Sequence, residues 1–353
     1  MKNLKYLLGA GCLLAGLFTA CSTDEIDEKN SIFQPDQTPK SAFDNWLDKT
    51  YMGPYNISYI YRMKDNEVDF SKNHVPSSLE NSMKLAKIIK YAWIDAYTEV
   101  AGEDFMRIAA PRVLQIIGSA SWNKDGTMTL GTAEGGIKVT LYMGNWLNEN
   151  DPAELNRYFF NTMHHEFSHI LHQTKQYPKE YNVISTSDYR PTAWHNRRTV
   201  ESYAQLGFIS NYAGSQPRED IAEVTCRYLT FSDSEWNRVV EAAGEEGAAK
   251  IAQKLKLVKE YMLKEWGIDM DLLKKVVARR MAEVSKIELL EPEWKRLLNG
   301  TNSVETSKAA LKIIENQLRS QWGEVVEAME HCPHCCHAHN ANLYELLNSH
   351  NDH

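Results

Sequence analysis

The sequence feature that most constrains the fold is the pentapeptide His165-Glu166-Phe167-Ser168-His169. In an α-helix, residues four positions apart lie one turn above each other on nearly the same face, so His165 and His169 can direct their imidazoles at one ion. Glu166 lies about 100° around the helix from His165, where it can take a proton from water without ligating the ion. The motif therefore predicts a helix that carries two zinc ligands and a general base.

The surrounding sequence supports a helix at this position. Asp151 and Pro152 form a good helix start, with a capping side chain, Pro at the first helical position and a carboxylate, Glu154, in the first turn. Apolar residues flank the histidines on both sides, at Phe160, Met163, Phe167, Ile170 and Leu171. We expect a helix from 151 to about 175. The alternative, that these are ordinary packed histidines, is weakened by this context.

A zinc hydrolase normally has three protein ligands and leaves a fourth position for water, so a third ligand must come from elsewhere. His172 is one candidate. On a continuous helix, however, it lies about 10 Å along the axis from His165, and no Gly follows His169 to turn the chain. A packing or substrate-side role for His172 is the alternative.

Glu219 and Glu223 form a better candidate, because they are four residues apart in a helix predicted from about 218 to 231. One carboxylate can ligate zinc while the other accepts a hydrogen bond from the outer nitrogen of a ligating His. We expect Glu219 to be the ligand and Glu223 to be the carboxylate that accepts the hydrogen bond from a ligating His. If Glu219 is not the ligand, His172 or Glu223 remains.

These blocks resemble the gluzincin branch of metallopeptidases, and their active-site motifs are similar to those of anthrax lethal factor. In that enzyme a Tyr precedes the ligand Glu by seven residues and the block closes with Ala-Glu, a spacing that Tyr212, Glu219, Ala222 and Glu223 match. The resemblance implies that Tyr212 hydrogen-bonds the oxyanion of the reaction intermediate. The alternative for Tyr212 is a side chain packed at the end of a loop.

The amino terminus has the layout of a bacterial lipoprotein signal. Lys2 and Lys5 precede an apolar run over residues 7–20, which ends in small residues before Cys21. We expect a signal peptide over residues 1–20 and lipidation of Cys21, against the alternative of a plain cleaved signal. The acidic stretch over 21–40 then reads as a tether, which is either a surface-export signal or a spacer.

Together these features resemble the substrate import-associated zinc metallohydrolase lipoproteins, over most of residues 1 to about 285. The resemblance implies a zincin fold, one Zn²⁺ per chain and an association with TonB-dependent outer-membrane importers. It also implies an outer-membrane lipoprotein of a Gram-negative bacterium, held to the membrane by its lipid, with the membrane face left open. The formal net charge of −8 and the lack of a basic stripe argue against nucleic acid as a partner.

The pattern of elements predicts an α+β fold. Strands are expected near 55–61, 113–119, 127–130 and 136–143, the last as the sheet edge above the motif helix, and amphipathic helices near 78–100, 232–265, 269–284 and 303–329. We expect a zincin-like catalytic core over 41–231, with a small mixed sheet packed on the motif helix, and a helical subdomain over 232–330.

Residues 331–353 form a tail rich in His and Cys, beginning His331-Cys332-Pro333-His334-Cys335-Cys336-His337. The tail offers many soft ligands, but its spacing matches no zinc module, so a metal-binding or a passive tail remains open. Trp194 and His195 are expected at the rim of the site rather than as ligands.

The sequence thus predicts a zinc metallopeptidase that cleaves a peptide or protein substrate in connection with nutrient import. Two alternatives remain: a non-catalytic zinc-binding accessory lipoprotein of an importer, and hydrolysis of a non-peptide amide or ester. An intact Glu166 favours catalysis, because a purely structural zinc site needs no general base beside an open coordination position.

Overall fold

The structure, a computed structural model, describes residues 39–63 and 71–301. Contacts divide the chain into two compact units, Met1–Lys40 and Ser41–His353, and all that follows concerns the second. The signal peptide, Cys21 and the tether, the helix expected over 303–329 and the tail over 331–353 lie outside the described residues, apart from 39 and 40. The expected boundary at residue 232 stays a prediction.

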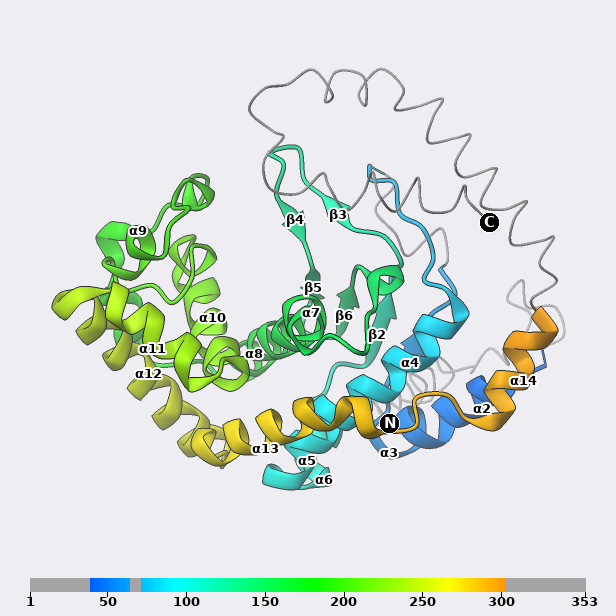
Figure 1. Cartoon of the computed structure of the whole chain (residues 1–353). Helices are drawn as coiled ribbons and strands as arrows, with labels where there is room; N and C mark the ends of the chain where they lie inside the picture. Colours follow the sequence, from blue (N-terminus) through cyan, green and yellow to red (C-terminus); the bar gives the residue numbers. More distant parts are fainter. Residues whose placement is uncertain (1–38, 64–70, 302–353) are drawn as a thin grey trace, which may run out of the picture. The chain divides into compact units, whose positions relative to one another are not determined.

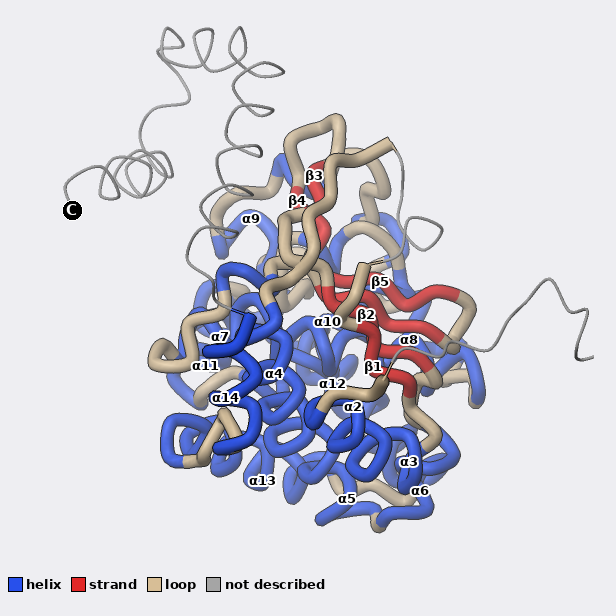
Figure 2. Tube along the Cα trace, turned by 90° about the vertical axis from the view of Figure 1, so that its right-hand side faces the viewer, coloured by secondary structure: helices blue, strands red, loops and turns tan. Residues whose placement is uncertain are grey.

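A four-stranded sheet forms one side of the fold, with strand order β1-β2-β6-β5 (Figure 2). Its first three members pair in parallel, namely β1 (Ser58–Ile60), β2 (Val113–Ile116) and β6 (Lys138–Leu141). The fourth, β5 (Gly131–Glu134), runs antiparallel to β6 and forms the edge. A separate hairpin joins β3 (Ser121–Trp122) and β4 (Met128–Thr129).

The strand expected over 136–143 is therefore not the sheet edge. Its residues form β6, which pairs with a strand on each side, and the edge is β5. Gly135 and Gly136 make this hairpin turn, because both have positive φ angles, 59° and 70°, as a tight turn of this twist requires. Gly and Ala at two of the four positions of β5 gave no strand signal in the sequence.

The predicted strand near 55–61 also begins later than expected. Residues 42–55 form one helical run made of α2 (Ala42–Leu47), η1 (Asp48–Met52) and α3 (Gly53–Tyr55). Asn56 then adopts a left-handed conformation, with φ of 55°, which ends the helix before β1 begins at Ser58.

Helices pack against the sheet (Figure 1). The bounds of the helices expected near 78–100 and 269–284 agree with the prediction to within about one residue. The predicted helix near 78–100 consists of α4 (Leu79–Ile89), η3 (Lys90–Ile94) and α5 (Asp95–Ala101), followed by α6 (Glu103–Ala109). Between the strands and the carboxyl-terminal helices come the short elements η4 (Gly144–Trp146), η6 (Lys179–Val183), η7 (Thr186–Asp188), η8 (Trp194–Asn196), α9 (Val200–Ala204) and η9 (Tyr212–Gly214).

The carboxyl-terminal part is helical, as predicted, with α10 (Pro217–Thr230), α11 (Asp233–Ala242), α12 (Gly244–Trp266), α13 (Met270–Glu283), η10 (Val284–Lys286) and α14 (Pro292–Thr301). The single helix expected over 232–265 is split at Gly244, whose φ of 64° interrupts it. Within the described residues, no helix is long and apolar enough to cross a membrane.

The motif helix begins where the sequence predicts. Asp151 caps it by accepting hydrogen bonds from the backbone of Ala153 and Glu154, and the run continues through α7 (Pro152–Leu155), η5 (Asn156–Phe160) and α8 (Asn161–Thr174). Phe167 is fully buried, with ring centroids 5.1 Å from Trp93 and 4.9 Å from Tyr97. Because this face of α8 packs into the core, its opposite face is turned toward α10 and the edge of the sheet.

Candidate metal centre

Helices α8 and α10 lie side by side and bring three predicted ligands together (Figure 1). Oε2 of Glu219 lies 3.1 Å from Nε2 of His165 and 3.0 Å from Nε2 of His169. The two Nε2 atoms are 3.1 Å apart. All three side chains are at least nine-tenths buried, with 8% to 9% of their surface exposed.

This donor set fits a zinc ion. Donors of a tetrahedral zinc site, with bonds of about 2.0–2.1 Å, lie about 3.3–3.4 Å from one another. The three observed separations of 3.0 to 3.1 Å agree within a few tenths of an ångström. Two imidazole nitrogens and one carboxylate oxygen are also ligands that zinc prefers.

Electrostatics favour an ionised Glu219. Burial acts to raise the pKa of its carboxyl group, but the hydrogen bonds and charges of His165 and His169 outweigh burial and hold that pKa well below its usual range. Gln216 donates a further hydrogen bond of 3.1 Å to Oε1. Glu219 is therefore an ionised carboxylate whose Oε1 is held by Gln216 and whose Oε2 faces the two imidazoles.

Glu223 lies behind the three donors, one helical turn after Glu219. Its Oε1 is 2.9 Å from Nδ1 of His165, and its Oε2 accepts hydrogen bonds from Ser210 at 2.6 Å and Arg227 at 3.1 Å. A carboxylate only accepts, so in the neutral ring of His165, the form that can ligate a metal, the hydrogen is on Nδ1 and the lone pair of Nε2 faces the donor set. Sequence reasoning missed Ser210 and Arg227. Only the i,i+4 spacing of Glu223 and Arg227 could have indicated the second.

His172 is not part of the donor set. Its Nε2 lies 3.0 Å from Nδ1 of His169, on the side of that ring away from Glu219. Among the described residues, two groups of side chains lie close enough to hold one ion, His165-His169-Glu219 and His165-Glu223-Cys226, and neither contains His172. The continuous helix carries His172 past the ion position, as its distance along the axis indicates.

Glu166 directly follows His165 on α8 and lies close to the edge strand β5. It is mostly buried, belongs to no metal-binding group, and among the described residues no side chain hydrogen-bonds to its carboxyl group. Burial raises its pKa, although the neighbouring histidines oppose the shift. At Gly131 on β5, an added Cβ would lie 3.3 Å from Cγ of Glu166 and 2.4 Å from Cγ2 of Thr162. Glycine thus permits the close approach of the edge strand to α8.

Tyr212, in η9, covers the ring of His165. The two ring centroids are 5.8 Å apart at an interplanar angle of 35°. Trp194 packs edge-on against Tyr212, with centroids 4.9 Å apart. Burial, together with the charge of Glu219, raises the pKa of Tyr212 well above its usual value, so the phenol keeps its hydrogen and can donate it.

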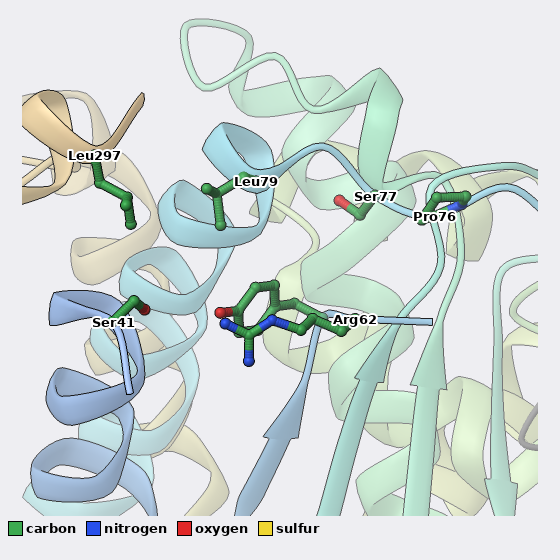
Figure 3. A pocket seen from close by; sticks show the side chains of 7 residues that line it. Ser41, Arg62, Pro76, Ser77, Leu79 and Leu297 are labelled. Atoms are coloured by element: carbon green, nitrogen blue, oxygen red, sulfur yellow. The ribbon is translucent and has the colours of Figure 1, made fainter. Parts of the chain in front are cut away.

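A surface hollow of about 380 Å³ lies away from these residues (Figure 3). It is lined by residues that include Ser41, Arg62, Ser77, Leu79 and Leu297. None of the candidate ligands, nor Glu166 or Tyr212, contributes to its walls, so the hollow is not part of the metal centre.

Comparison with known proteins identifies the family of the chain. The family described as "Putative zinc-binding metallo-peptidase" matches residues 36–271 of the chain. The chain belongs to this family. A crystal structure described in the same words, from Bacteroides caccae ATCC 43185, is 53% identical, covers 73% of this chain and 98% of its own, and has a TM-score of 0.64. The comparison with curated proteins finds no match.

Membership of this family confirms the predicted α+β, zincin-like fold and the expected metallopeptidase family, whereas the gluzincin class, the lipid anchor and the association with importers stay predictions. The matched range, 36–271, includes every candidate residue of the metal centre. It ends within α13.

Proposed function

We propose that the chain is a zinc-dependent metallopeptidase in which His165, His169 and Glu219 hold one zinc ion. The observation that carries this proposal is the triangle of donor atoms, with sides of 3.0 to 3.1 Å, formed by two helices that are distant in sequence. Three protein ligands leave one coordination position for water or substrate, which is the arrangement of catalytic rather than structural zinc sites.

Zinc in this position supplies Lewis acidity, which polarises a carbonyl group and lowers the pKa of water. Glu166 accepts the proton of the attacking water and delivers it to the leaving amine. Its burial and raised pKa suit this exchange, because a carboxyl group whose pKa lies closer to neutrality both takes and gives a proton readily. Tyr212 keeps its phenolic hydrogen and uses it to donate a hydrogen bond to the oxyanion that develops on the carbonyl.

The substrate is an extended peptide segment that pairs with β5. This strand is the edge of its sheet, and its start at Gly131 lies against Thr162 and Glu166 of α8. Backbone groups on an unpaired strand edge bind an extended chain by main-chain hydrogen bonds, whatever its side chains. A peptide bound there passes directly beside Glu166.

In the cell, the chain acts as an outer-membrane lipoprotein, anchored through Cys21, with importer components as partners. The support for this part is the signal layout over residues 1–20, the acidic stretch after Cys21 and the family resemblance described above.

The test is peptide hydrolysis by the wild-type chain and by Glu166→Gln. We expect cleavage of a mixed peptide library by the wild type, a loss of about 10²- to 10⁴-fold in kcat for Glu166→Gln, and unchanged zinc content in both. Glu180→Gln, in the neighbouring η6, serves as the control and keeps full activity. If the wild type binds zinc but cleaves neither peptides nor simple amides and esters, the chain is a non-catalytic zinc-binding protein.

A further inference from the structure

His172 is the one histidine of the motif helix that contacts a candidate ligand without belonging to the donor set. It is buried, its Nε2 lies 3.0 Å from Nδ1 of His169, and the ring centroids are 5.0 Å apart at 65°. Tyr177 packs against the same ring, with ring centroids 5.4 Å apart. Packing thus holds the ring of His172 in line with the outer nitrogen of His169.

This contact can form in two ways, because each neutral imidazole has one hydrogen and one lone pair. In the first, Nδ1 of His169 donates to Nε2 of His172, and the lone pair of His169 Nε2 faces the donor set. In the second, Nε2 of His172 donates, and the hydrogen of His169 is on Nε2, where it points at Oε2 of Glu219, 3.0 Å away. Only the first arrangement leaves His169 able to ligate.

His165 has no such choice. Its Nδ1 faces the carboxylate of Glu223, which cannot donate, so the hydrogen of His165 is on Nδ1 in either case. The two candidate ligands therefore differ: His165 is fixed in its ligating form, whereas the form of His169 depends on that of His172.

The ligating arrangement requires the hydrogen of His172 on Nδ1. That nitrogen is buried and has no hydrogen-bond partner in the part of the chain that the structure describes. A buried ring nitrogen without a partner calls for an explanation. The hydrogen bond from His169 supplies that explanation. When Nε2 of His172 accepts it, the single ring hydrogen of His172 must be on Nδ1, even though Nδ1 has no partner there.

We infer that His172 is a positioning residue, whose Nε2 lone pair accepts the Nδ1 hydrogen of His169 and so selects the tautomer of His169 that binds zinc. The inference rests on the proposed zinc site. Residues that orient a ligating histidine in this way typically contribute 10- to 100-fold to metal affinity. Here a neutral imidazole, rather than a carboxylate, performs that role for one of the two histidines.

The experiment is the zinc dissociation constant of the full chain, measured by competition with a chelator, for the wild type, His172→Leu, His172→Gln and His164→Leu. Leu removes the acceptor, whereas the Gln side-chain oxygen can occupy the place of Nε2 and accept. His164 is a matched control on the same helix. It is buried, and its Nδ1 contacts the hydroxyl of Tyr97 at 3.0 Å rather than a ligand.

We expect His172→Leu to weaken zinc binding by about 10- to 100-fold and His172→Gln to restore most of that affinity. His164→Leu should lower the melting temperature without changing the zinc affinity. Wild-type affinity in His172→Leu, or an equal loss in His164→Leu, overturns the role of His172 and leaves the proposed function intact. If the wild type itself holds no zinc, the proposed function fails as well.

Discussion

Oδ2 of Asp220 lies 2.6 Å from Nζ of Lys254, and neither side chain has any exposed surface. Asp220 directly follows Glu219 in the first turn of α10, whereas Lys254 belongs to α12. Tyr189 donates a 2.7 Å hydrogen bond to the same carboxylate oxygen, and Lys254 donates one of 2.7 Å to the carbonyl of Gly207. Helix α12 thus contacts α10, one of the two helices of the candidate metal centre, through a buried ion pair.

Removing one member of this pair should be costly. Lys254→Met leaves the charge of Asp220 buried without its partner, and we expect a loss of about 3–5 kcal/mol in the free energy of unfolding. The double variant Asp220→Asn with Lys254→Met leaves no buried charge and should recover much of that loss. Urea unfolding of the variants measures both effects.

Lys256→Met is the matched control, because Lys256 is in the same helix but 73% exposed. It should change the unfolding free energy by less than about 0.5 kcal/mol. Equal stabilities of Lys254→Met and Lys256→Met would mean that the buried pair does not stabilise the fold.

Because β5 approaches α8 closely at Gly131, a substitution there should lower activity, and a second substitution at Thr162 should restore part of it. Gly131→Ala places a Cβ only 2.4 Å from Cγ2 of Thr162, which is too close for two carbon atoms, so the edge strand must move away from the helix. Because the strand is where we propose the substrate binds, kcat/KM for peptides should fall on the order of 10- to 100-fold, with zinc content unchanged. Adding Thr162→Ser removes Cγ2 and should restore part of the activity. Wild-type kcat/KM in Gly131→Ala alone argues against substrate binding at this edge.

Asp44 predicts a pH-dependent part of the stability. Burial acts to raise its pKa, but hydrogen bonds from Arg62, Ser41 and Tyr61 outweigh burial and lower the pKa to about 2, from 3.8. A carboxyl group whose pKa is lower in the folded state stabilises the fold above the unfolded pKa and loses that contribution as the pH falls through the folded one. Asp44→Asn should therefore be less stable than the wild type at neutral pH.

The stability difference between wild type and Asp44→Asn should shrink as the pH falls from about 4 toward 2. Urea unfolding at several pH values measures it. A difference that stays constant over this range would show that hydrogen-bond geometry, and not the charge of Asp44, accounts for the effect.

The sequence predicts the motif helix well because its signals are local. Asp151 and Pro152 mark the start, and the apolar residues around His165 mark the face that packs into the core. Glu219 was proposed as a ligand from spacing and resemblance, and the structure places its carboxylate beside both imidazoles. Its role as a ligand stays a prediction until metal binding is measured.

Features that depend on distant partners were not predictable in the same way. The strand β5 forms because β6 pairs with it, and its own residues have weak strand preference. In the sequence, Lys254 looks like any charged residue on the polar face of a helix. In the structure it is buried, because Asp220 of another helix forms an ion pair with it. Ser210 likewise contacts Glu223 across a loop, with no pattern in the sequence to indicate it.

The most direct test of the zinc site is the zinc content per full-length chain, measured by elemental analysis of the wild type and of Glu219→Ala. The His- and Cys-rich tail is present in both proteins, so metal bound there cancels in the comparison. We predict that the wild type holds about one zinc more per chain than Glu219→Ala, because the variant lacks one of three ligands. Equal zinc content in the two proteins would contradict Glu219 as the third ligand, and absence of zinc from the wild type would contradict the zinc site itself.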